Sequence, residues 1–252
     1  MHRVRSIFAV VVAIALTLVL AGACTTTSDW RTASSEPAGL APDPLVVREA
    51  LVQVYAARTW GWRGYFGVHT WIAVKPSGAG AYTVYEVIGW RLRSGRSVVA
   101  ASERPADARW YGSLPEVIAQ KRGAGVDAII ERIDKAAAAY PYADRYTAWP
   151  GPNSNTFTAW VLRAVPELKA DLPPTAIGKD YLGDGVVSSA PSGSGHQLSL
   201  GGVLGVAASG VEGLELNVLG LTFGINPFDP SLKLPLVGRV GPERRLDTVV
   251  AK

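Results

Sequence analysis

Residues 66–92, FGVHTWIAVKPSGAGAYTVYEVIGWRL, predict the element around which the fold is built. Between residues 68 and 74 two sets of side chains alternate, which is the period of a β-strand. PSGAG at 76–80 predicts a turn, and YTVYEVIGWRLR at 82–93 predicts the partner strand. The segment therefore predicts a β-hairpin, and SVVAAS at 97–102 predicts a third strand.

His69 lies inside the first strand of this hairpin, where its neighbours would fix the imidazole ring. If the turn is centred near Gly78, Tyr85 lies on the same face of the hairpin as His69. A slip of one residue exchanges the two faces of the strand and brings Glu86 beside His69 instead. Both Tyr85 and Glu86 are therefore candidates to orient the imidazole.

Two amphipathic helices are predicted after the strands. Apolar residues recur at helical spacing from Val126 to Ala137, and Pro141 ends this helix. WPGPNSNTFTAWV at 149–161 begins the second helix. Ser154 precedes Phe157 by three residues, so the spacing directs Ser154 at the protein and not at solvent. Strands followed by helices predict an α+β fold.

The N-terminus has the anatomy of a secretory signal over residues 1–23: two arginines, an apolar run and then small residues. LAGAC at 20–24 resembles the lipobox of bacterial lipoproteins, which implies lipidation of Cys24. Cys24 is the only cysteine of the chain, so it has no internal disulfide partner. Residues 24–44 are rich in Thr, Ser, Ala and Pro and predict a flexible tether.

These features place the protein in the cell envelope, attached to a membrane through a lipid on Cys24. Lipoprotein sorting reads the next residue, and Thr25 is not the aspartate that retains a lipoprotein at the inner membrane. In a cell with two membranes the resemblance therefore implies the outer membrane. Removal of Arg3 and Arg5 leaves 23 basic against 21 acidic residues, so no nucleic-acid partner is expected.

Composition shifts near residue 183. All eight Trp lie between Trp30 and Trp160, and the chain beyond 183 is Gly-rich. We therefore expect an α+β domain over 45–182 and a β-rich extension over 183–252. In the extension, apolar residues alternate over 214–225 with a change of phase after Val218, which predicts a β-bulge or a switch of the exposed face.

The apolar set over 214–225 has two interpretations. Pairing with HQLSLGGVLGVAA at 196–208 would let it cover the main sheet. Alternatively, it contacts a membrane or an oligomer partner.

Ser154 is a candidate nucleophile. Gly151 and Pro152 place a turn ahead of it, and the free N–H groups at a helix start stabilise an oxyanion. A serine needs a base; His196 lies in a flexible Gly/Ser loop, so His69 is the better candidate. The alternative is that Ser154 only caps its helix, because Asn and Ser are favoured capping residues.

NSNTF at 153–157, preceded by Tyr146, resembles the N-C-N-x-F segment of permuted papain-like proteins, namely the lecithin:retinol acyltransferase group, deSUMOylating-type peptidases and cell-wall amidases. In those families a strand histidine precedes a nucleophile at the start of a packed helix. The resemblance implies a permuted papain-like core with Ser154 as nucleophile, in place of cysteine, and His69 as base. Tyr85 or Glu86 would orient the base, and Asn153 would stabilise the oxyanion.

A second resemblance covers roughly residues 45–182. The stretch from VQVYAARTWGWRGYFGVHTW at 52–71 to LPPTAIGKDY at 172–181 resembles a family of bacterial lipoproteins classed as a domain of unknown function. That family carries no established activity.

Two functions are therefore expected. One is hydrolysis or acyl transfer on an amide or ester of the envelope. The other is non-catalytic binding of a glycan, a peptide or a partner protein, with Trp71, Trp149 and Tyr146 lining a groove. The alternative for the tryptophans, and the commoner case, is that they belong to the core. No His, Cys or carboxylate cluster has metal-ligand spacing, and no cofactor is expected.

Overall fold

The computed structural model describes residues 29–242, so the predicted signal segment and Cys24 lie outside the described residues. Contacts divide the chain into one unit up to Ala33 and a second unit from Ser34 onward. In the first unit, Thr32 N donates to Asp29 O at 3.0 Å and closes a turn. The helices and strands named below all belong to the second unit.

The first half of that unit is an antiparallel sheet of five strands in the order β4-β3-β2-β1-β5. The strands are β1 (Leu51–Arg58), β2 (Val68–Lys75), β3 (Thr83–Val87), β4 (Val99–Glu103) and β5 (Glu116–Arg122). Short 3-10 helices η1 (Gly61–Tyr65) and η2 (Gly89–Ser94) follow β1 and β3. The predicted hairpin and third strand are confirmed as β2, β3 and β4.

The register of the β2–β3 hairpin decides which side chain meets His69. Ile72 pairs with Tyr85, one residue away from the register of a turn centred at Gly78. Glu86 therefore shares a face with His69, and Tyr85 points to the other face, where its hydroxyl donates to Asp134. Of the two candidates to orient the imidazole, Glu86 is the partner and Tyr85 is not.

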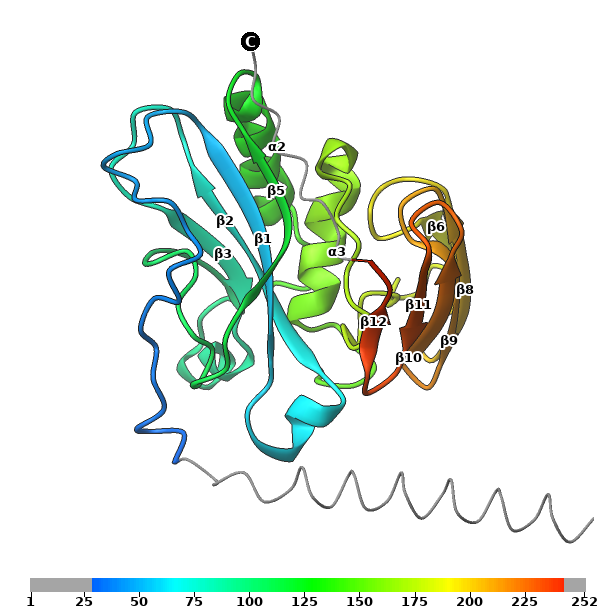
Figure 1. The fold of residues 1–252 in the computed structure, drawn as a ribbon. Coiled ribbons are helices and arrows are strands. Elements are labelled where there is room, and N and C mark those ends of the chain that lie inside the picture. The colour runs from blue at the N-terminus through cyan, green and yellow to red at the C-terminus, as the bar shows by residue number, and fades with distance from the viewer. Residues whose placement is uncertain (1–28, 243–252) are drawn as a thin grey trace, which may run out of the picture. The chain divides into compact units, whose positions relative to one another are not determined.

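Two helices, α2 (Val126–Ala138) and α3 (Ser154–Ala164), cover one face of this sheet, and η3 (Pro166–Leu168) follows α3 (Figure 1). Val54, Ile72, Ile133 and Phe157 are among the buried residues of this core. The two predicted helices are therefore confirmed, with their apolar stripes packed inward.

The opposite face of the sheet carries a second core, in which Tyr55 stacks on Trp71 at 5.4 Å between ring centroids. The N-terminal segment runs along this side: Leu40 N donates to Asp107 Oδ2 at 2.6 Å, and the Tyr82 hydroxyl donates to Pro42 O at 2.8 Å. The predicted tether over 24–44 is therefore wrong for this part of the chain, which is fastened to the domain.

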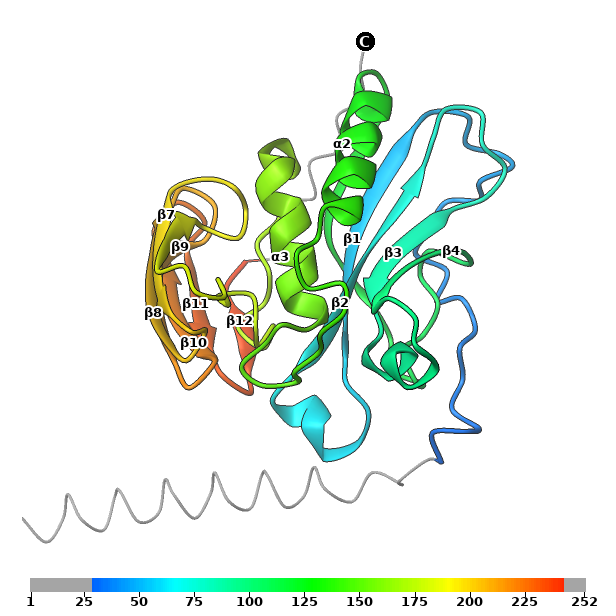
Figure 2. The ribbon, with the colours of Figure 1, turned by 180° about the vertical axis from the view of Figure 1, so that it is seen from behind.

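The C-terminal part forms an antiparallel sheet of seven strands in the order β12-β11-β10-β9-β8-β7-β6. These strands are β6 (Val187–Ser189), β7 (His196–Leu200), β8 (Leu204–Ser209), β9 (Gly213–Val218), β10 (Leu221–Asn226), β11 (Ser231–Leu234) and β12 (Gly238–Val240). Helix α3 lies between the two sheets, as both views show (Figures 1 and 2). The expected pairing of 196–208 with 214–225 is present as β8–β9.

The change of phase after Val218 marks a turn. Leu219 and Gly220 both have positive φ, 55° and 81°, and Val218 pairs with Leu221 across this two-residue loop. Both predicted alternatives, a β-bulge and a switch of the exposed face, are wrong at this point, because the loop lets β9 and β10 keep their apolar side chains on one face. No helix among residues 29–242 has the length and apolar character needed to cross a membrane.

Candidate functional sites

His69 belongs to a buried, hydrogen-bonded cluster on the sheet face away from the helices. Its Nε2 lies 2.9 Å from Glu86 Oε2. The other carboxylate oxygen of Glu86 accepts from Arg104 Nη2 at 3.0 Å and Nε at 3.2 Å. The side chains of His69 and Glu86 are 6% and 4% exposed, so both groups are withdrawn from solvent.

The ionisation of this cluster follows from its burial. Burial lowers the pKa of His69 below its ordinary value, against the opposing effect of Glu86. Burial opposes ionisation of Glu86 as well, but the hydrogen bond from His69 and the guanidinium of Arg104 hold its pKa below the ordinary value. A carboxylate only accepts hydrogen bonds, so neutral His69 carries its proton on Nε2.

Aromatic rings close the other side of the His69 cluster. The ring of Trp110 stacks on the imidazole with 3.6 Å between centroids and 9° between planes. Trp90 stacks on Trp110 at 6.0 Å and is itself 48% exposed. The hydrogen bond to Glu86 and the stacked ring of Trp110 together hold the His69 imidazole in place.

The structure does not bring His69 and Ser154 together. In β2 the neighbour of His69, Thr70, faces α3, and its hydroxyl lies 2.9 Å from Thr158 Oγ1 and 3.0 Å from Asn155 Oδ1. Successive side chains of a strand point to opposite faces, so the imidazole is directed away from the helix that carries Ser154. The expected base and the expected nucleophile are separated by the sheet.

The side chains of the NSNTF segment anchor the start of helix α3. Asn155 Nδ2 donates to Val68 O at 3.1 Å and to Ile177 O at 2.8 Å, and Thr156 Oγ1 donates to Gly178 O at 2.7 Å. These bonds fasten the start of α3 to β2 and to the segment around residue 177. Gly178 has φ +96°, and a Cβ there would lie 2.4 Å from the Asn153 side chain, so the fit admits only glycine.

Asn153, and not Ser154, caps helix α3. The Asn153 side-chain oxygen accepts from Asn155 N at 2.9 Å and from Thr156 N at 3.2 Å, and Thr156 Oγ1 accepts from Asn153 N. The side-chain nitrogen Nδ2 of Asn153 donates to Ala148 O and to Ile177 O. The side chain of Asn153 and the N–H groups of Asn155 and Thr156, which were expected to stabilise an oxyanion, are thus occupied. Ser154 itself is buried, and its backbone O accepts from Thr70 Oγ1 at 3.4 Å.

The three residues expected to line a groove lie in different surroundings. Trp71 is fully buried and donates from Nε1 to Ala106 O at 2.7 Å, so its interpretation as a core residue is confirmed and the prediction that it lines a groove is wrong. Trp149 is 51% exposed, and its Nε1 donates to Leu219 O in the β9–β10 turn. Tyr146 is 39% exposed and packs over Gly89, where a Cβ would lie 2.5 Å from its ring.

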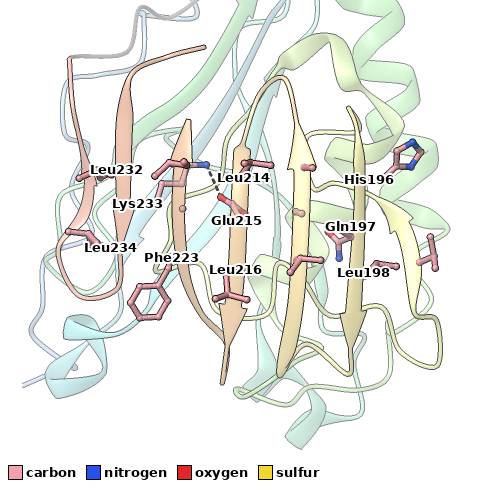
Figure 3. Close-up of a pocket in the computed structure, with 16 residues that line it drawn as sticks. His196, Gln197, Leu198, Leu214, Glu215, Leu216, Phe223, Leu232, Lys233 and Leu234 are labelled. Atoms are coloured by element: carbon pink, nitrogen blue, oxygen red, sulfur yellow. Dashed lines mark hydrogen bonds and ion pairs between the residues drawn. The ribbon is translucent and has the colours of Figure 1, made fainter. Parts of the chain in front are cut away.

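The C-terminal sheet has its apolar side chains on the outside. These side chains line a shallow hollow of about 770 Å³ (Figure 3). We call this surface the apolar face; its central residues, each between 37% and 54% exposed, are Leu198, Val206, Leu214, Leu216, Phe223, Ile225, Leu232 and Leu234. The expectation that this apolar set covers the main sheet is wrong, because the polar face of the C-terminal sheet is the one turned inward.

A buried ionic cluster lies on that inner face. Lys233 Nζ binds Asp171 Oδ1 at 2.5 Å and Glu215 Oε1 at 2.7 Å, and Lys179 Nζ binds the other oxygen of Glu215. The side chains of both lysines are 1% exposed. Burial opposes the charge on Glu215, but the two ammonium groups hold its pKa below the ordinary value. These pairs fasten β9 and β11 to residues 171–180, and Lys179 accordingly keeps its charge.

Sequence reasoning missed this ionic cluster, although a signal was present. Gln197, Glu215 and Lys233 occupy the strand positions that alternate with the apolar residues, and all three are buried (Figure 3).

Among residues 29–242, no three His, Cys, Asp or Glu side chains are grouped in a way that could hold a metal ion.

The fold and these sites define an α+β protein in which one helix layer separates two antiparallel sheets. A family model described as "Protein of unknown function (DUF3750)" matches residues 49–181, and the chain belongs to this family. No curated protein and no solved structure matches the chain. The matched segment holds the His69 cluster and the NSNTF segment, whereas the apolar face lies beyond it.

Proposed function

We propose that this protein is an exported, lipid-anchored component of the cell envelope that docks, without catalysis, through the apolar face of its C-terminal sheet. The observation that carries the proposal is the orientation of this sheet, which turns Glu215 and Lys233 inward and Leu214, Leu216 and Leu232 outward. The lipidated Cys24 would hold the protein at a membrane, on the extracytoplasmic side.

The positions of the two expected catalytic groups, Ser154 and His69, support a function without catalysis. A serine hydroxyl is a weak nucleophile without an adjacent base, and His69 hydrogen-bonds to Glu86 on the other side of the sheet. The Asn153 side chain and the N–H groups of Asn155 and Thr156 are used for capping. In this proposal the domain keeps the chain order of a permuted papain-like core, with a strand histidine before the helix, and lacks the reacting pair.

Docking follows from the cost of leaving the apolar face in water. The largest apolar patch of an ordinary monomer covers roughly 300–600 Å², and larger patches are typical of interaction sites. Five strands, β7 to β11, contribute the central residues of this face, and none of these residues is Asp, Glu, Lys or Arg. Burial of apolar surface contributes about 25 cal/mol per Å², so covering this face is strongly favourable.

Thiol protection tests the docking proposal. Cys24 is the only cysteine and would be lipidated, so Leu216→Cys and Val46→Cys each introduce a single reactive thiol. Val46 is 73% exposed in the N-terminal segment and serves as the matched control. In native envelope fractions we expect a polar maleimide to label Val46→Cys and to leave Leu216→Cys unlabelled until the sample is denatured. Equal labelling of the two native variants would overturn the proposal.

A further inference from the structure

We propose that the apolar face docks on a second copy of this chain, so that two C-terminal sheets pack face to face as a β-sandwich. This inference rests on the proposed docking function and names its partner.

The apolar side chains form continuous rows across the strands. Val187 pairs with Leu198, Leu198 with Val206, Val206 with Leu216, and Leu216 with Phe223. This row crosses five strands, β6 to β10, without a charged residue. When two sheets pack face to face about 10 Å apart, rows of this kind from the two sheets interdigitate.

A second row runs parallel to the first. Leu214 pairs with Ile225, Ile225 with Leu232, and Leu232 with Val240. The groove between the two rows can receive a row from a facing copy. A two-fold axis through the face would make each copy supply both the row and the groove, as an isologous interface requires.

The area suits a stable dimer. Leu200, Leu204 and Val218 extend the face and are 57%, 48% and 38% exposed. From the exposed fractions of these residues and the central residues, the face offers on the order of 1,000 Å² per copy, whereas an interface of standard size needs about 800 Å² per partner. Obligate homodimer interfaces are also the most apolar class, which matches a face whose central residues are Leu, Val, Ile and one Phe.

The chemistry of the face favours protein over lipid as the occupant. Surfaces that lie on a bilayer combine apolar residues with Lys or Arg and with Trp or Tyr at the interface. The central residues of the apolar face include none of these four types. The sheet also has two open edges, β6 and β12, whose backbone groups hydrocarbon could not satisfy.

Photocrosslinking of the full-length, lipidated chain tests the inference. A benzophenone amino acid replaces Leu216, and two differently tagged copies are produced in the same cells. We expect a crosslinked product of twice the monomer mass that carries both tags. Phe223→Glu, which places a charge in the middle of the interface, should reduce the product at least ten-fold. Val46→Glu, at an exposed position outside the face, should leave it unchanged.

Three outcomes overturn the inference, and they differ in what they say of the docking function. Crosslinks to lipid alone, or to a different protein alone, would exclude the second copy and leave the docking function standing. Product that survives Phe223→Glu would place the contact elsewhere. Absence of any crosslink, together with full maleimide labelling of Leu216→Cys, would overturn both proposals.

Discussion

His69 and Glu86 form a hydrogen bond of 2.9 Å on the sheet face that α3 does not cover. The pair has the appearance of an oriented catalytic base, with a carboxylate behind the ring. Its surroundings give it another role, because Trp110 covers the imidazole and Arg104 neutralises the carboxylate. The pair therefore stabilises the outer face of the five-stranded sheet.

Removal of the Glu86 carboxylate should destabilise the fold. Glu86→Ala leaves the Arg104 guanidinium and the His69 ring without their shared acceptor, and breaking a buried ion pair costs about 3–5 kcal/mol. Urea denaturation measures the free energy of unfolding. Glu103→Ala, at an exposed position in β4, is the control and should change it by less than about 0.5 kcal/mol. Equal effects of both variants would contradict this role of Glu86.

The lowered pKa of His69 predicts a pH dependence of stability. Below an unfolded pKa of about 6.5 the unfolded chain binds a proton that the folded chain does not, so the unfolding free energy falls as pH falls. The slope from this one group is at most about 1.4 kcal/mol per pH unit. His69→Gln should remove it in the window between pH 6.5 and the lower folded pKa. Parallel stability curves for parent and variant would exclude this origin.

Asn153 and Ser154 should differ sharply on truncation. Asn153→Ala removes the cap of α3 and two further hydrogen bonds, and loss of a cap alone costs about 1 kcal/mol. Ser154→Ala removes a hydroxyl that takes no part in capping α3, so its effect should be smaller. Thermal and urea unfolding of the two variants measure the difference. A larger loss for Ser154→Ala would contradict the assignment of the cap.

Ser154 should also be unreactive. Because the expected base His69 is hydrogen-bonded to Glu86 on the other face of the sheet, a serine-directed phosphonate probe should label neither the parent chain nor Ser154→Ala. Mass spectrometry of the intact protein after incubation measures the labelling. A phosphonate adduct on the parent that disappears in Ser154→Ala would restore the hydrolase hypothesis.

The buried ionic cluster predicts a large cost for the removal of Glu215. Glu215→Gln leaves the ammonium groups of Lys179 and Lys233 without their shared carboxylate, and we expect a loss of about 3–5 kcal/mol. The pKa of Glu215 is lowered, so its contribution is present above the ordinary pKa of a glutamate and is lost as acid protonates it. Lys135→Met, on the exposed side of α2, is the control. A similar stability for Glu215→Gln and the parent would contradict the role of the cluster.

The sequence predicted the elements better than the faces they bury. The hairpin over 66–92 and both helices followed from periodicity, but the choice between Tyr85 and Glu86 depended on a register that the turn sequence PSGAGAY leaves open by one residue. The same limit applies to the position of Ser154. Its chain order relative to His69 was evident, whereas the side of the sheet on which each lies was not.

The orientation of the C-terminal sheet shows the limit of local patterns most clearly. Period two identified strands over 214–225, and the usual rule places the apolar set inside. Here the inward face is fixed by groups distant in sequence, because Lys179 and Asp171 supply the partners of Glu215 and Lys233. Only the folded chain brings these charges together, and the apolar residues are then left on the outside.

The most direct test of the account is the rate at which a polar maleimide labels Leu216→Cys in native envelopes, relative to Val46→Cys. A face docked on a second copy predicts at least ten-fold slower labelling at residue 216, and Phe223→Glu in the same chain should restore the rate. Labelling of the two thiols at rates within two-fold of each other would contradict the claim that the apolar face is covered.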